Sequence, residues 1–113
     1  MTEDQPISPI HIECKIVQII IDLETHTEAF EGLSKAHAKA EAAYKAAWYK
    51  EFIQAEGAMK AKESWAGFKT TDLHYEMLVS DALVRAKREK LHSLRTACDA
   101  LRTLSANVRI QSQ

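Results

Sequence analysis

The last third of the chain, residues 80–110, has an apolar pattern that repeats every seven residues. Its two rows of apolar side chains are Leu94, Leu101 and Val108, and Val84, Leu91 and Cys98. Because a helix turns once every ~3.6 residues, both rows lie on one helix face, which needs a partner to be buried. We expect copies of the chain to assemble through this seam. The residues expected in that contact are Leu91, Leu94, Leu101, Leu104 and Val108.

The composition of the chain favours few, long elements. Its 113 residues include only three Gly and two Pro, and much of the apolar content is alanine. Such a chain has few residues that favour turns, and it is long enough for one domain. Long alanine-rich helices bury modest area each and usually gain stability by pairing or oligomerising. We therefore predict an all-α fold: a long antiparallel helical hairpin with a shorter N-terminal helix, oligomerising through its C-terminal helix.

The N-terminal segments are the hardest to assign. Residues 1–9 contain both Pro and two acidic residues, which predicts a flexible acidic arm before a single helical domain over residues 10–113. Residues 10–23 are rich in the β-branched residues Ile and Val, which favour a strand, but their apolar side chains also recur with helical spacing. Helix is favoured because no other strand candidate exists to pair with them. Residues 24–33 contain two Thr and a Gly and are expected to form a kink or short turn.

Two long helices are expected after this kink. Residues 33–65 are rich in Ala, Lys and Glu and carry one apolar stripe, which strongly favours helix. Gly67 is a plausible C-cap, and a threonine after it is expected to cap a last helix over residues 72–107. A short turn near residues 67–71 then makes the antiparallel hairpin.

No constellation typical of an enzyme or a metal site is present. His11, Glu13 and Cys14 form an HxEC sequence similar to half of a deaminase zinc motif, whose PCxxC half is missing. His37 and Glu41 are spaced by one helical turn, with no second His four residues from either. The sequence has no GxSxG and no glycine-rich phosphate loop. We expect no catalytic residue, metal or cofactor.

The expected compartment is the cytoplasm. Cys14 and Cys98 belong to no pair motif, and Cys98 lies on the apolar seam, which indicates a reducing environment. The N-terminus has no signal-peptide pattern, and the longest apolar run, Ile19–Ile21, is far too short to span a bilayer. We therefore expect no membrane partner.

The charge of the chain is unevenly distributed, although its net value is −1. Residues 1–34 carry one Lys and seven acidic residues, whereas residues 68–113 carry eight basic and five acidic residues. This asymmetry indicates an acidic arm and a basic body, and the plain alternative is a solvated helix surface. The nearly neutral total does not favour strong nucleic-acid binding by a monomer, but an oligomer would concentrate its basic faces.

Two basic groups are candidates for phosphate contact. Lys60 and Lys62 are followed by the aromatic residues Trp65 and Phe68. The second group is a tract made up of Arg85, Lys87, Arg88 and Lys90. In single-stranded nucleic-acid sites, lysines follow the phosphates and rings stack on bases, so Trp65 is the stacking candidate. The alternative is that the two rings simply close the core of the hairpin.

The order of these features resembles the UvsY-type recombination mediators of phages. The resemblance covers residues 33–110: a long helix with a Trp, the KAK of residues 60–62, a polar break, and a final helix ending in DALRTLSANVRI. It implies helical subunits that form rings through the C-terminal helix and bind single-stranded DNA. It also implies partners, a RecA-like recombinase and a single-strand-binding protein, in the host cytoplasm. The break is shorter here than in the family.

Two other interpretations remain open. The tripeptide Trp65-Ala66-Gly67 is similar to the turn of the secreted WXG helical hairpins, although the YxxxD/E secretion signal of that family is missing after the second helix. The heptad seam alone also fits a coiled-coil scaffold or a phage assembly adaptor. DNA binding that weakens steeply with salt would favour the mediator, whereas a scaffold would assemble without DNA.

Overall fold

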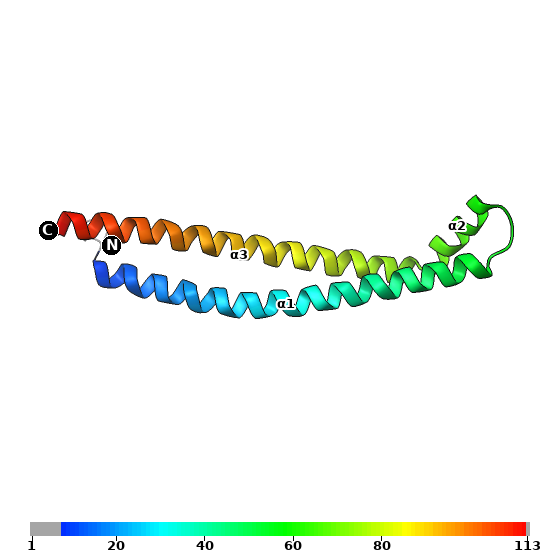
Figure 1. Cartoon of the computed structure of the whole chain (residues 1–113), viewed down its shortest axis with the longest axis horizontal. Helices are drawn as coiled ribbons and strands as arrows, with labels where there is room; N and C mark the ends of the chain where they lie inside the picture. Colours follow the sequence, from blue (N-terminus) through cyan, green and yellow to red (C-terminus); the bar gives the residue numbers. More distant parts are fainter. Residues whose placement is uncertain (1–7, 113) are drawn as a thin grey trace, which may run out of the picture. The chain divides into compact units, whose positions relative to one another are not determined.

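The computed structural model describes residues 8–112, and this part of the chain forms three helices and no strand. The helices are α1 (Pro9–Gln54), α2 (Met59–Lys69) and α3 (Thr71–Ser112) (Figure 1). The predicted all-α class is confirmed. The long hairpin is also confirmed, with α1 and α3 as its antiparallel arms. The short helix α2 was not expected.

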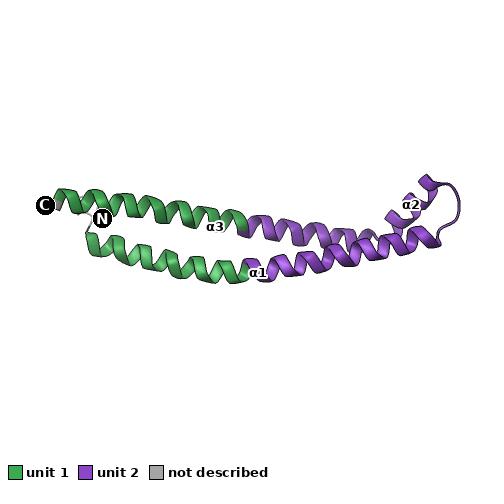
Figure 2. Cartoon of the chain, viewed as in Figure 1, with its two compact units in different colours: residues 1–29, 88–113 green, residues 30–87 purple. Residues whose placement is uncertain are grey.

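Two compact units divide the hairpin (Figure 2). The first unit combines residues 1–29 with residues 88–113, so that its described part pairs the start of α1 with the end of α3. The second unit spans residues 30–87 and contains the end of α1, all of α2 and the start of α3. Each unit is therefore built mainly from one segment of each long helix.

The separate N-terminal helix and the kink expected over residues 24–33 are wrong, because α1 runs through both regions without a break. The hydroxyls of Thr25 and Thr27 donate hydrogen bonds to the carbonyls of Ile21 and Leu23, four residues earlier, at 3.1 and 2.6 Å. These bonds satisfy the hydroxyls inside a helix, so the threonines do not require a turn. A glycine costs only about 1 kcal/mol within a helix, and packing against α3 outweighs that cost.

The start of α1 has the features of a capped helix. Ser8 Oγ accepts a hydrogen bond from the backbone N–H of Ile10 at 3.1 Å, and Pro9 is the first helical residue. A serine cap followed by a proline is a common beginning, because proline lacks an N–H that the helix could not pair there. Of the acidic arm predicted over residues 1–9, residues 1–7 lie outside the described part of the chain. The last residue of the predicted arm, Pro9, is the first residue of α1.

The chain reverses earlier than the sequence predicted. Helix α1 ends at Gln54, and Gly57 takes a φ of +108°, a conformation that residues with a Cβ rarely adopt. The tripeptide Trp65-Ala66-Gly67, expected between helices, instead lies inside α2. The Thr70 hydroxyl donates a hydrogen bond to the Ala66 carbonyl at 2.7 Å and thus completes the end of α2 instead of capping the next helix.

The heptad seam of α3 faces the interior of the hairpin. In the first unit Leu91 and Cys98 are buried together with Ile12 of α1, and in the second unit Val84 is buried. Leu91 is 4% exposed in the single chain. The other residues expected to mediate assembly are half-buried, namely Leu94, Leu101, Leu104 and Val108. Their apolar face is largely covered by α1 of the same chain, and assembly through it stays a prediction.

Candidate nucleic-acid interface

Exposed lysines and aromatic rings occur on α2, and we call Lys60, Trp65, Phe68 and Lys69 the α2 surface. Because a helix turns by ~100° per residue, Trp65 and Lys69 share one side of α2 whereas Lys60 leaves it on the other. All four side chains are exposed, the Trp65 ring to 45% and Phe68 to 74%. The Nζ atom of Lys69 lies 4.7 Å from the centroid of the Trp65 ring. Such a contact is a cation–π interaction, and at an exposed site it is worth about 0.5–1 kcal/mol. The contact is therefore weak enough for a ligand to displace the ammonium group.

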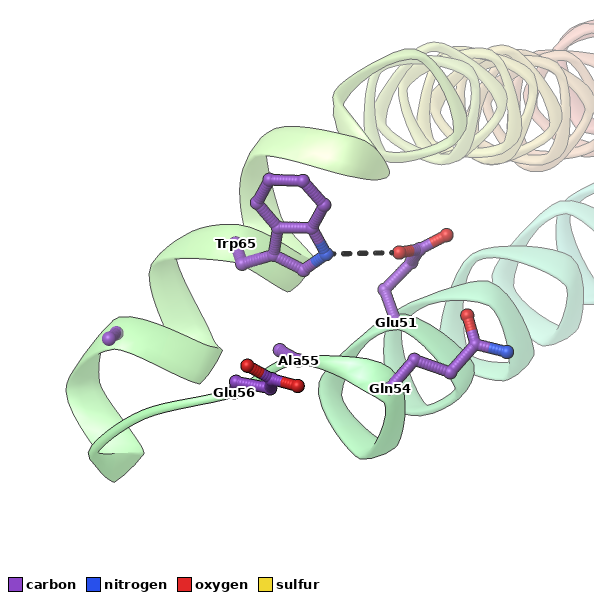
Figure 3. A pocket seen from close by; sticks show the side chains of 6 residues that line it. Glu51, Gln54, Ala55, Glu56 and Trp65 are labelled. Atoms are coloured by element: carbon purple, nitrogen blue, oxygen red, sulfur yellow. Dashed lines mark hydrogen bonds between the residues drawn. The ribbon is translucent and has the colours of Figure 1, made fainter.

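The Trp65 ring is oriented by a residue from α1. Its Nε1–H donates a hydrogen bond to Glu51 Oε2 at 3.1 Å (Figure 3). A pocket of about 510 Å³ lies beside this contact (Figure 3). The side chains that line it are Glu51, Gln54, Ala55, Glu56, Ala61 and Trp65. The two carboxylates make the pocket itself unfavourable for phosphate, so phosphate contact on this side of the unit rests on the exposed lysines.

Lys62 differs from Lys60 in its surroundings. The side chain of Lys60 is exposed, whereas Lys62 is half-buried and its Nζ lies 5.6 Å from the centroid of the Phe52 ring. Phe52 in turn stacks on Trp48 with a centroid separation of 5.2 Å. The stem of Lys62 thus covers an aromatic cluster on α1, as long cationic side chains often do. Of the two predicted lysines, Lys60 is the more accessible.

The predicted basic tract of α3 spans the boundary between the two units. Arg85 and Lys87 belong to the second unit, together with α2, whereas Arg88 and Lys90 belong to the first unit. The guanidinium of Arg85 forms an ion pair with Asp81 at 2.9 Å. Lys87 is half-buried, while Arg88 and Lys90 are exposed. Trp65 and Arg85 lie in the same unit but on different helices.

A polar cluster in the second unit joins α1 to α3. His37 Nδ1 and Ser80 Oγ are 2.9 Å apart, and His37 Nε2 lies 3.3 Å from Glu41 and 3.9 Å from Asp81. The Ser80 hydroxyl donates a hydrogen bond to the Met77 carbonyl at 2.8 Å, and which atom donates between His37 and Ser80 depends on the tautomer of the imidazole.

The carboxylate of Glu41 also pairs with Lys45 on the same helix, at 2.9 Å. The hydrogen bond from Lys45, helped by its positive charge, lowers the pKa of Glu41, and the same bond raises the pKa of Lys45. The i,i+4 spacing of His37 and Glu41 was visible in the sequence. Ser80 and Asp81 had no sequence signal, because only the pairing of α1 with α3 brings them to His37.

Comparisons with protein-family models, with curated protein sequences and with solved structures found no match. Among the described residues, no helix is long and apolar enough to cross a membrane. The same residues contain no group of three or more His, Cys, Asp or Glu side chains placed to hold a metal ion. The function must therefore be argued from the surfaces of the hairpin itself.

Proposed function

We propose that this chain is a non-enzymatic accessory protein that binds single-stranded DNA as a homo-oligomer. In this proposal it acts in the cytoplasm and helps load a RecA-like recombinase onto strands covered by a single-strand-binding protein. The observation that carries the proposal is the α2 surface: an indole held in place by Glu51, with exposed lysines on the same short helix. Rings that stack on bases beside cations that meet phosphates are the usual parts of a single-strand site.

The geometry of α2 supports stacking on Trp65 in particular. Because Glu51 holds Nε1, the ring keeps its orientation without a ligand, and less entropy is lost when a base stacks on it. Lys69 can leave the ring for a phosphate at little cost, since their contact is exposed. Lys60 projects from the first turn of the same helix and is exposed. Binding would therefore replace weak internal contacts with contacts to the strand.

The proposal is tested by fluorescence anisotropy of a labelled single-stranded oligonucleotide at low and moderate salt. Trp65→Ala should weaken binding roughly tenfold, since stacking of a base on an aromatic ring is worth about 1–3 kcal/mol. In the double variant Lys60→Ala with Lys69→Ala, the slope of log K against log salt should become shallower by about 0.7 for each phosphate contact that is lost. The charge-matched control is Lys35→Ala with Lys39→Ala, two exposed positions on α1, which should bind like the parent chain. Failure of the parent chain to bind any oligonucleotide at low salt refutes the proposal.

A coiled-coil scaffold is the second candidate, and one observation favours it. In the first unit, Ile10, Cys14, Val17 and Ile21 recur with helical spacing, and all four side chains are exposed. This row lies on the side of α1 opposite the buried seam, where the helix of a second copy could cover it. Val17→Asp should then reduce the mass measured by light scattering, because assembly would bury a charge. An unchanged mass removes this row from any assembly contact.

A further inference from the structure

Four arginines repeat at intervals of seven residues in the part of α3 that belongs to the first unit. We call Arg88, Arg95, Arg102 and Arg109 the arginine ladder. Seven residues make nearly two complete helical turns, so the four side chains leave the helix on almost the same side. Consecutive rungs are separated by about 10.5 Å along the axis at ~1.5 Å per residue. The ladder thus forms a straight row of positive charge about 31 Å long.

The rungs are open to solvent. All four arginines are exposed, and the side chain of Arg102 is 64% exposed. The carboxylate nearest to Arg102 is that of Asp99, at 4.0 Å, a distance too long for a strong ion pair. Among the residues that the structure describes, Arg95 and Arg109 form no ion pair. The guanidinium groups of at least these rungs therefore keep their charge available to an anion.

Pairing within the hairpin does not account for the ladder. The ladder lies beside the buried seam of α3, at positions where paired helices commonly exchange salt bridges. The side of α1 that is buried or half-buried in this unit includes Ile12, Ile19 and Leu23. The positions next to this side are Glu13, Ile20 and Thr27 on one flank, and Lys15, Asp22 and Ala29 on the other. Both flanks together offer two acidic residues and one basic residue. Arg95, Arg102 and Arg109 therefore outnumber the acidic residues on these flanks of α1.

We infer that the arginine ladder is a second binding surface for nucleic acid, with its guanidinium groups on the phosphates of a single strand. The inference rests on the proposed function and adds to it a site separate from the α2 surface. Arginine suits this role because it is always charged and presents planar N–H donors that match phosphate oxygens. A row of evenly spaced cations recognises the repeating phosphates of the backbone without reading the bases. Contact with this surface should therefore be insensitive to sequence.

The test compares the salt dependence of single-strand binding in three variants of the full chain. Replacing Arg95, Arg102 and Arg109 with Gln removes three phosphate contacts. The slope of log K against log salt should become shallower by about 2, at ~0.7 per contact. The same positions changed to Lys should keep the parent slope, because each cation is retained. In the charge-matched control, the exposed Lys15, Lys35 and Lys39 of α1 become Gln, and the slope should not change.

The outcomes separate this inference from the proposed function. A parent chain that binds with a slope unaffected by the three Gln substitutions overturns the ladder alone. A parent chain that binds no single strand at low salt overturns both. A Gln variant that keeps the slope but loses the parent mass in light scattering shows that the ladder contacts an acidic protein surface, which also overturns the inference. Circular dichroism of each variant should match the parent, since all the changed side chains are exposed.

Discussion

Replacing Leu91 with Ala tests whether the heptad seam is buried inside one chain. Leu91 is only 4% exposed, and it lies in the first unit together with the buried residues Ile12 and Cys98. Leu to Ala substitutions at buried sites cost about 2–5 kcal/mol, depending on how far the structure relaxes around the gap. A unit of two paired helix segments can relax more easily than a large core, so we expect the lower end, about 2–3 kcal/mol. At about 4 °C per kcal/mol, the Tm should fall by about 8–12 °C.

Thermal unfolding followed by far-ultraviolet circular dichroism measures this loss. Leu78→Ala is the matched control, because it makes the same change on α3 at a side chain that is 52% exposed. Its cost should be about 0.5 kcal/mol or less. An equal fall in Tm for both variants would refute the burial of Leu91.

Two further perturbations follow from the structure. Gly57→Ala should lower the free energy of unfolding by about 1–3 kcal/mol, because φ is +108° at this residue. Gly32→Ala, in the middle of α1 with nothing within 4 Å of the added Cβ, should raise it by about 0.5–1 kcal/mol. Chemical denaturation measures both changes, and changes of the same sign would contradict the turn at Gly57. Because Lys45 lowers the pKa of Glu41, their pairing contributes stability above the ordinary pKa of Glu and loses it as the pH falls through the lowered value. In the Lys45→Met variant, NMR titration should find the pKa of Glu41 closer to its ordinary value. An unchanged pKa would show that Glu41 and Lys45 do not pair in solution.

The pairing of the two long helices was predictable because the seam has a strict period. Leu91 and Cys98 are seven residues apart in the sequence, and both are buried. The turns were harder, since they depend on a few backbone angles. Gly67 was expected to end a helix but lies inside α2, whereas Gly57 was taken for a helical residue but makes the reversal. A glycine permits both conformations, and only the packing of α2 on α1 decides between them.

The predicted basic tract of α3 illustrates how a helix distributes residues that follow one another in the sequence. Arg85, Lys87, Arg88 and Lys90 are dense in the sequence, but at ~100° per residue they point in four different directions. One of them, Lys87, is half-buried in the seam. The arginine ladder is sparse in the sequence, with one arginine in seven residues, but all its members lie on one side of α3. Because phosphates follow one another along a line, we expect a periodic row on one helix face to indicate strand binding better than a local run of charge does. The salt slope of the Gln variant at Arg95, Arg102 and Arg109 is therefore also a test of that rule.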